Sequence, residues 1–291
     1  MHVARTPALH LGVWATSRAA RSDWTHAILS SLLGASLVAY VVALAAISLA
    51  RIVYPYPLDD LEPVALAEVQ RILQGQPIYA PPTLEYVPLI YGPVYFYLSA
   101  AVATLTGPGF ASLRVVATLA SAGMIALAGL FVRRETGSLA AALVAAGLLA
   151  ASFPLVNGAM SVGRTDSTCL VFLLAALYLV RTASLAPRTR WWTVAASGFL
   201  AGLALLTKQS STPVVVALVV YLGCVAPRQV VPFVVAMCLT VAVPVGLLTC
   251  SPIARHCSTC GSCPNGTSFG PTSSRTSGKL TYSLALPPCY C

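Results

Sequence analysis

The sequence predicts an all-α, polytopic membrane protein with about seven to eight transmembrane helices and an amphipathic helix in its first outer loop. Two observations carry this prediction. Hydrophobic residues make up 57% of the 291 residues and charged residues only 9%, a balance that excludes an ordinary soluble domain. The apolar residues also gather in long runs, of about the size that crosses a bilayer, with short polar segments between them.

The apolar runs follow one another along most of the chain. The first run comes after a basic segment, residues 1–26, which we expect to be cytoplasmic. Several later runs are shorter than the ~20 residues that a perpendicular helix needs, so tilted helices are expected. The membrane domain is predicted over residues 27–249, with apolar runs at 27–50, 91–107, 114–132, 139–155, 168–180, 192–207, 213–226 and 230–249.

The first outer loop, residues 51–113, holds most of the acidic residues. The whole chain contains only eight, and Asp59, Asp60, Glu62, Glu68 and Glu85 all lie here. Residues 60–74 show helical periodicity, and we expect this helix to lie flat on the membrane. Asp59 and Glu62 have the spacing of a capping box, and Gly75 is a suitable end. The expected apolar side consists of Leu61, Val64, Ala65, Ile72 and Leu73, and the more polar side of Glu62, Glu68 and Arg71.

The topology of the later loops depends on residues 91–107. If this run crosses the membrane, Asp166 and Lys208 face away from Asp59. If it dips into the membrane or lies along its surface, more of the Lys and Arg residues fall in inner loops, which the positive-inside rule favours. Aromatic residues beside Gly92 also suit an interfacial or re-entrant helix. We therefore expect the acidic stretch, Arg164, Asp166 and Lys208 to share the outer face.

The acids that precede the amphipathic helix have two interpretations. A helix N-terminus favours negative charge, which is worth about 1 kcal/mol and requires one acid. A carboxylate at the mouth of a cavity would instead accept a proton from an attacking hydroxyl group. Asp59, Asp60 and Glu62 are three acids within four residues, more than a cap requires. We expect catalysis to involve them.

Three further charged residues stand at the ends of apolar runs. Arg164 and Asp166 could form an ion pair at a helix start, with Asp166 as its N-cap, and this structural role is compatible with a functional one. Asp166 could orient a second carboxylate or a substrate hydroxyl, and Arg164 could bind phosphate. Lys208 at a span end is explained equally well by snorkelling and by contact with an anionic lipid headgroup.

An ordered set of short motifs resembles the integral-membrane type C glycosyltransferases, especially the bacterial group related to family 39 mannosyltransferases and lipid A sugar transferases. The motifs are Tyr54-Pro55, the acids at 59–62, Gly75-Gln76-Pro77-Ile78-Tyr79, Tyr91-Gly92-Pro93, Gly163-Arg164-Thr165-Asp166 and Thr207-Lys208-Gln209. The resemblance covers about residues 27–249. It implies inverting transfer of a sugar from a polyprenyl-phosphate donor on the outer face.

The resemblance also implies roles for individual residues. Asp59 or Asp60 would be the catalytic base, with Glu62 beside it and Asp166 in the second outer motif. Arg164 belongs to the same second motif, Lys208 would contact the donor phosphate, and Tyr91 is a candidate substrate contact. The first motif reads Asp59-Asp60-Leu61-Glu62 here, whereas the family often has Asp-Glu or Glu-Gly, so the choice of base stays open.

The expected partners are the polyprenyl-phosphate-sugar donor, a lipid, glycan or protein acceptor, and membrane lipids, in the cell membrane with the active site outside. No nucleic acid is expected, because the basic residues are scattered between spans as topology signals. No cofactor is implied with certainty, no metal ligand set stands out in the membrane part, and a divalent cation is compatible with the carboxylates. The alternatives are an inactive, truncated membrane protein or a transporter, which would favour internal repeats that the sequence lacks.

The last segment, residues 250–291, differs abruptly in composition. It is rich in Ser, Gly and Cys, and Cys257, Cys260 and Cys263 invite a metal-binding interpretation, with His256 as a candidate ligand. A matching second pair is missing, since Cys289 and Cys291 have the wrong spacing. We expect this tail to be disordered or foreign to the family, and the chain to be truncated or read in a shifted frame near residue 250.

Overall fold

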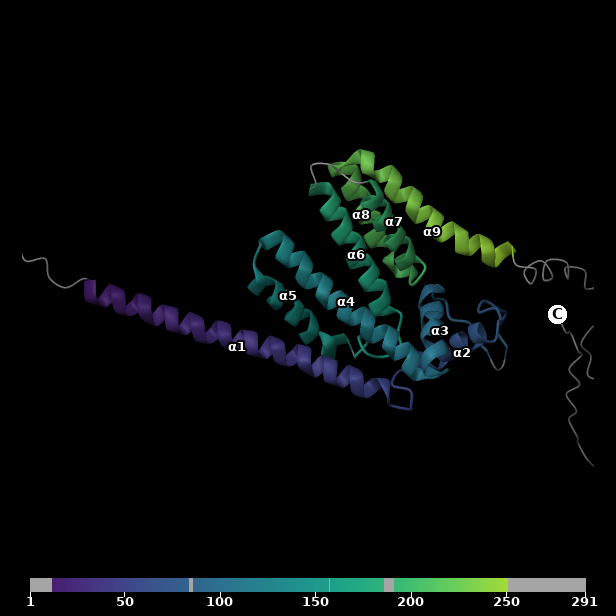
Figure 1. Cartoon of the computed structure of the whole chain (residues 1–291), viewed down its shortest axis with the longest axis horizontal. Helices are drawn as coiled ribbons and strands as arrows, with labels where there is room; N and C mark the ends of the chain where they lie inside the picture. The colour runs from purple at the N-terminus through teal and green to yellow at the C-terminus, as the bar shows by residue number, and fades with distance from the viewer. Residues whose placement is uncertain (1–11, 84–85, 157, 186–190, 251–291) are drawn as a thin grey trace, which may run out of the picture. The chain divides into compact units, whose positions relative to one another are not determined.

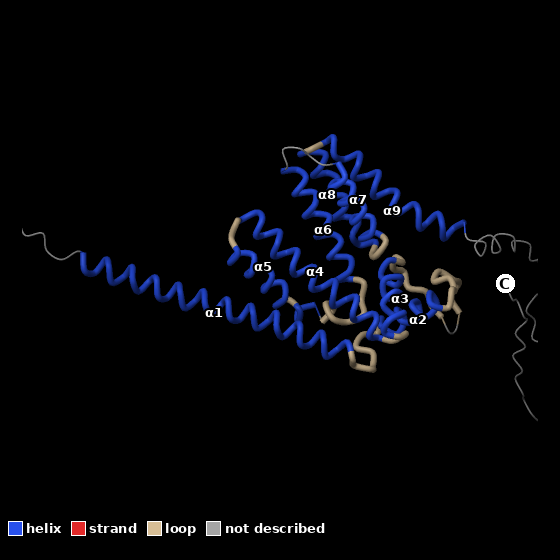
Figure 2. The backbone as a smooth tube through the Cα atoms, viewed as in Figure 1, coloured by secondary structure: helices blue, strands red, loops and turns tan. Residues whose placement is uncertain are grey.

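The computed structural model describes residues 12–83, 86–156, 158–185 and 191–250. Glu85 and the cysteine-rich tail lie outside these residues. Every regular element within them is helical (Figures 1 and 2). The α-helices are α1 (Gly12–Ile52), α2 (Leu61–Leu73), α3 (Val94–Thr106), α4 (Phe110–Thr136), α5 (Leu139–Ala151), α6 (Asp166–Leu185), α7 (Trp191–Leu205), α8 (Thr212–Val225) and α9 (Val230–Cys250), and 3₁₀ turns occur at Phe153–Val156, Gln209–Ser211 and Pro227–Gln229.

The prediction of an all-α, polytopic membrane protein is confirmed. Five helices in the described residues are long and apolar enough to cross a membrane: Ala27–Ile52, Phe110–Thr136, Leu139–Val156, Asp166–Ser184 and Pro227–Gly246. Three shorter apolar helices bring the number near the expected seven to eight. One of these, α3, has 13 residues and is therefore only about 20 Å long. That length falls short of a bilayer core of about 30 Å, as do the lengths of α7 and α8, so a run that does not cross stays a prediction.

Helices α6, α7, α8 and the first half of α9 share one hydrophobic core. Fully buried Val180, Val194, Leu222 and Phe233 lie within it. Helix α7 approaches α9 so closely that a Cβ added at Gly198 would lie 2.1 Å from the carbonyl oxygen of Phe233. Glycine at this position therefore allows α7 and α9 to pack closely.

A second core joins α2, α3 and the start of α4, with Ala65, Val69, Tyr95, Phe96 and Leu113 buried in it. The amphipathic helix predicted over residues 60–74 is present as α2, and Gly75 follows it with φ +70°. Its buried face, however, is different from the predicted one. The deeply buried residues of α2 are Glu62, Ala65, Glu68 and Val69, so the expected polar side packs into protein. Both glutamates find partners there, which the sequence pattern alone did not reveal.

Helix α4 packs against both α5 and α6, and α1 packs along α4 and α5 (Figure 1). Leu44, Met124, Ala150, Phe153 and Met160 form the core between them. Helix α1 starts at Gly12, so much of the segment expected to precede the first span is continuous with it. From Val241 the chain belongs to a second compact unit, of which the structure describes the helical residues up to Cys250, with Pro244 inside the helix.

Candidate functional site

The charged residues singled out by sequence come from three distant parts of the chain and meet at one place. Asp59 precedes α2, Arg164 and Asp166 stand at the start of α6, and Lys208 follows the end of α7. Helices α6 and α7 pack against each other as consecutive elements, so the start of one lies beside the end of the other. Ion pairs join these four residues, and their location on the outer face stays a prediction.

The four side chains form a linear chain of ion pairs. Lys208 Nζ lies 2.5 Å from Asp166 Oδ1, and Arg164 Nε lies 3.0 Å from Asp166 Oδ2. Arg164 also reaches Asp59, with 3.2 Å between a guanidinium nitrogen and Oδ2. The side chains are between 22% and 30% exposed, so they are accessible to a ligand. We call Asp59, Arg164, Asp166 and Lys208 the ion-pair chain.

Arg164 is the centre of this chain because it bridges two carboxylates. Burial lowers the pKa of its guanidinium, but the hydrogen bond and charge of Asp166, together with Asp59, outweigh that effect and hold the pKa above its ordinary value. Asp59 is fixed from the other side, since its Oδ1 accepts a hydrogen bond of 3.0 Å from the backbone N–H of Leu61. Arg164 is therefore permanently charged, and its two carboxylate partners hold it in place.

Tyr91 lies beside the ion-pair chain. The ammonium group of Lys208 is 5.4 Å from the centre of the Tyr91 ring, within the range of a cation–π contact. The loop that carries Tyr91 is joined to the residues around Lys208 by two backbone hydrogen bonds, from Gly92 N to Thr207 O and from Val94 N to Leu206 O, each 3.3 Å. A Cβ at Gly92 would lie 1.8 Å from the carbonyl oxygen of Leu206, so this close approach requires glycine.

Asp60 and Glu62 take positions different from that of Asp59. Asp60 is exposed at the N-cap of α2 and makes no capping hydrogen bond with its side chain. Glu62 is completely buried. Its Oε2 accepts a hydrogen bond of 2.8 Å from Leu58 N, and Oε1 accepts one of 2.7 Å from Gly163 N. The expected capping box is thus replaced by separate contacts, because Asp59 accepts from Leu61 while Glu62 reaches back to Leu58.

Glu62 is held by a residue that sequence reasoning missed as part of the site, Arg114 at the start of α4. Their side chains meet at 2.6 and 2.9 Å, and both are 0% exposed. Arg114 also donates to the backbone carbonyls of Arg51, Tyr54 and Tyr56 at 2.6 to 2.7 Å. We call this pair the buried clamp. The sequence does offer one signal, because an arginine at the edge of an apolar run indicates a buried partner.

The buried clamp joins the two segments that carry the ion-pair chain. Through Arg114 it holds the loop that leads to Asp59, and through Glu62 it holds Gly163, which precedes Arg164. Burial raises the pKa of Glu62, but hydrogen bonds from Arg114, Leu58 and Gly163, with the charge of Arg114, outweigh burial and bring the pKa below its ordinary value. Glu62 is therefore an anion without access to a substrate, which favours a positioning role.

A second buried carboxylate, Glu68, organises the loop that ends at Tyr91. It accepts hydrogen bonds from the Tyr86 hydroxyl at 2.6 Å and from Leu89 N at 2.9 Å. Burial, followed by this hydrogen bond to Glu68, raises the pKa of Tyr86, and the guanidinium of Arg71 lies 4.1 Å from the centre of the Tyr86 ring. The sequence showed Glu68 only as one more acid of the loop.

The space beside Arg164 and Asp166 is small. A hollow of about 10 Å³ is lined by both residues, with Tyr91 and Tyr95 among the others. That volume holds at most a water molecule, so a sugar would have to lie over the exposed side of the ion-pair chain. Within the described ranges, no group of three His, Cys, Asp or Glu side chains is arranged to hold a metal ion, and both carboxylates of the ion-pair chain already face cations.

Comparison with known families gives one match. A family model described as dolichyl-phosphate-mannose-protein mannosyltransferase matches residues 88–255, more than half of the chain. The matched segment includes Tyr91, Arg114, Arg164, Asp166 and Lys208, whereas the acids at 59–62 precede it. Comparisons with curated proteins and with solved structures find no significant match.

Proposed function

Because the chain belongs to the dolichyl-phosphate-mannose-protein mannosyltransferase family, and is thus a membrane protein of a glycosyltransferase family, we propose that it transfers a sugar from a polyprenyl-phosphate donor to an acceptor hydroxyl at the ion-pair chain. The observation that carries this proposal is the meeting of two carboxylates and two cations from three distant segments at one partly exposed place. The sugar and the acceptor are left open.

Arg164 and Lys208 supply the charge that a donor phosphate requires. In a region of low dielectric, a phosphate needs cations within hydrogen-bonding reach. Arg164 offers two parallel N–H donors and Lys208 a mobile ammonium group. Asp166 lies between them, at 3.0 Å from Arg164 and 2.5 Å from Lys208, and keeps both at the same point. The leaving phosphate would be stabilised as the bond to the sugar breaks.

Asp59 is the carboxylate that we assign as the general base. It belongs to the ion-pair chain, whereas Asp60 makes no ion pair within the described part of the protein, and Glu62 is enclosed. A donor phosphate would compete with Asp59 for Arg164. An incoming anion that takes over the guanidinium frees one carboxylate oxygen of Asp59 beside the substrate. The base would then become available only when the donor is bound.

The reaction itself is a single displacement. The acceptor hydroxyl oxygen forms a bond to the anomeric carbon from the face opposite the phosphate, and its proton passes to Asp59. The bond between the anomeric carbon and the phosphate oxygen breaks, and the electron pair leaves with the polyprenyl phosphate. One displacement inverts the configuration at the anomeric carbon. Glu62 and Arg114 take no part in these steps but keep Asp59 and Arg164 at the required separation.

The substitution Asp59→Asn tests the assignment of the base, with Asp60→Asn as the matched control. Loss of a general base costs about 10²–10⁴ in rate. We expect this loss of kcat for Asp59→Asn and near-normal turnover for Asp60→Asn at equal expression, measured with a polyprenyl-phosphate sugar and membranes that contain the acceptor. If Asp59→Asn turns over normally, the acidic stretch is structural, and an inactive or transporting membrane protein becomes the better account.

The outer-face location is tested by the sidedness of single cysteines in a background without native cysteines. Pro81 in the first loop is exposed, as is Thr136 at the end of α4, which lies at the opposite end of that helix from Arg114. We expect a membrane-impermeant thiol reagent to label Pro81→Cys in intact cells and to label Thr136→Cys only after permeabilisation. The reverse pattern would move the site to the inner face, and equal labelling would contradict a crossing by α4.

A further inference from the structure

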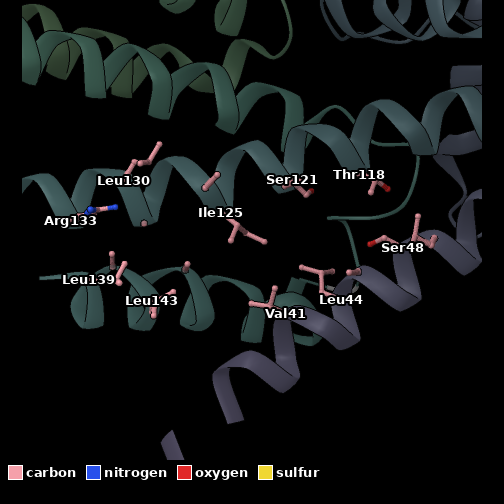
Figure 3. Close-up of a pocket in the computed structure, with 17 residues that line it drawn as sticks. Val41, Leu44, Ser48, Thr118, Ser121, Ile125, Leu130, Arg133, Leu139 and Leu143 are labelled. Atoms are coloured by element: carbon pink, nitrogen blue, oxygen red, sulfur yellow. The ribbon is translucent and has the colours of Figure 1, made fainter. Parts of the chain in front are cut away.

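An apolar cavity lies away from the ion-pair chain, between α1, α4 and α5 (Figure 3). Its volume is about 630 Å³, which falls in the range of roughly 300–1,000 Å³ that is typical of ligand sites. The wall is almost entirely aliphatic. Among the lining residues are Val41 and Leu44 from α1, Ile125 and Leu130 from α4, and Leu143 from α5.

The cavity has a closed floor and an open side. Leu44, Ser48 and Ala142 are buried at 3% to 6% exposure. Leu130 and Leu143, which line the same space, are 49% and 59% exposed. The three helices belong to the segments that are long and apolar enough to span the bilayer, so the open side faces lipid. An apolar space of this size would be filled by the hydrocarbon around it, since vacant space forfeits packing contacts.

Charge is distributed unequally between the two ends of the cavity. Hydroxyl groups of Ser48 and Thr118 are found at the end nearer the ion-pair chain, and Thr118 Oγ1 is buried there without a hydrogen-bond partner. The guanidinium of Arg133 stands at the other end and points along the cavity (Figure 3). Arg133 is exposed and forms no ion pair with any described residue, whereas the neighbouring Arg134 faces the Tyr178 ring at 5.7 Å.

We propose that this cavity binds an anionic glycerophospholipid, with the phosphate at Arg133 and one acyl chain lying between α1, α4 and α5. Helix α5 begins at Leu139, which lines the cavity near Arg133 (Figure 3), so the positive end of its dipole adds to the attraction for an anion, while the N–H of Ala141 is capped by Ser138. The opposite end offers only neutral hydroxyls, which cannot compensate a phosphate. From Arg133 to Thr118 the helix rises roughly 22 Å, long enough for an acyl chain to pass the middle of a core of about 30 Å.

This lipid site is distinct from the proposed donor site. Arg133 lies in the last turn of α4, whereas Arg114 in its first turns belongs to the buried clamp that holds Gly163 next to Arg164. The two proposed phosphate positions are therefore at opposite ends of α4. The lipid would fill the space between the first span and the α4–α5 pair. Its expected effect is on the stability of the folded chain and not on the chemical step.

Thermal unfolding of the purified full chain in neutral detergent tests the proposal, with dioleoyl phosphatidylglycerol as the probe and dioleoyl phosphatidylcholine as the neutral lipid with the same chains. We expect phosphatidylglycerol to raise the Tm by several degrees and phosphatidylcholine to raise it much less, because only a ligand that binds the folded state shifts the Tm. Arg133→Gln should lose most of the phosphatidylglycerol effect, and the matched variant Arg134→Gln should keep it.

A second pair of variants separates the cavity from general lipid binding. Ala126 lines the cavity, so Ala126→Phe should fill it and abolish the phospholipid adduct seen by native mass spectrometry. Leu119, which is 65% exposed on α4 and does not line the cavity, is the control as Leu119→Phe. If Ala126→Phe does not fold, Ala122→Phe fills the same space.

Three outcomes would overturn the assignment: an unchanged phosphatidylglycerol response in Arg133→Gln, a retained adduct in the folded phenylalanine variants, or equal stabilisation by both lipids. Displacement of phosphatidylglycerol by a polyprenyl phosphate would show that the cavity binds the donor, and it would also overturn the proposal.

Discussion

The buried clamp and the ion-pair chain are made of the same kinds of side chain but differ in their surroundings. Glu62 and Arg114 are 0% exposed and meet at 2.6 Å, whereas Asp59 and Arg164 are 23% and 30% exposed and meet at 3.2 Å. An ion pair that is buried without water does not readily exchange one of its ions for a ligand, because the other charge would be left buried without a partner. A partly exposed pair contributes little to stability and can take another ion. The buried clamp therefore suits a fixed structural role, and the ion-pair chain suits reversible binding of a ligand.

The largest effect should come from breaking the buried clamp. Removal of one partner of a buried ion pair costs roughly 3–5 kcal/mol, because the other charge stays buried without a partner. We expect Arg114→Ala to lower the free energy of unfolding by about this amount, and its three carbonyl partners add to the loss. Unfolding in denaturant, in a detergent that supports the native state, gives the value.

The double variant Glu62→Leu with Arg114→Leu tests whether the buried clamp positions the ion-pair chain in addition to stabilising the fold. It removes both charges and should be more stable than either single variant, because no unpaired charge remains. Its turnover should nevertheless stay low if the clamp positions Asp59 and Arg164. A double variant with normal stability and normal turnover would show that the clamp has no positioning role.

An intermediate effect is expected when the cations of the ion-pair chain are removed. Arg164→Ala and Lys208→Ala should each raise the KM for the lipid-linked sugar by roughly tenfold or more, the equivalent of about 1.4 kcal/mol or above. Arg164→Lys should recover only part, because the two parallel donors are lost. Arg228→Ala is the matched control, since Arg228 is exposed beyond the far end of α8. An unchanged KM in both alanine variants would exclude these cations from donor binding.

The smallest effect is expected from pH. The pKa of Glu62 is lowered from its ordinary value of 4.5. A lowered carboxyl pKa contributes stability that is fully present above the unfolded-state value and is lost as the pH falls through the folded-state value. The difference in Tm between the native chain and Glu62→Gln should thus be constant above about pH 5.5 and shrink below pH 4.5. A difference that grows on acidification would mean that Glu62 is protonated in the folded state.

The sequence predicted the helices well and their buried faces less well. Long apolar runs identify spans because a bilayer leaves the backbone few other options, and the runs at 114–132, 213–226 and 230–249 correspond closely to α4, α8 and α9. The run at 168–180 fell short of α6, because Thr182 and Ser184 near its end bond to the carbonyls of Tyr178 and Arg181 and so continue the helix. Polar residues therefore do not mark the end of a helix when their hydroxyl groups bond to carbonyls of the same helix.

The sequence predicted four members of the candidate site, whereas Arg114 and the contacts of Glu62 and Glu68 were not predicted. Topology alone brought Asp59, Arg164, Asp166 and Lys208 to one face. The partners of Glu62 and Glu68 could not be found from sequence, because they come from α4, from Gly163 and from the loop at 86–89, all remote from the periodicity of α2. The sequence periodicity of a helix is the same whether its glutamates face water or a buried guanidinium.

The bond between Glu62 and Gly163 has a consequence for biosynthesis. The two residues are 101 positions apart, and Glu62 and Arg114 are 52 apart. A chain that enters the membrane from its N-terminus therefore exposes Glu62 well before α4 is made, and both partners are available only after α5 has been inserted. Until then Glu62 lacks the N–H of Gly163 and stays partly hydrated. Donor binding should thus be acquired late in assembly, after the α4–α5 hairpin has entered, and nascent chains that stop short of residue 163 should remain inactive and open to proteolysis around residues 51–62.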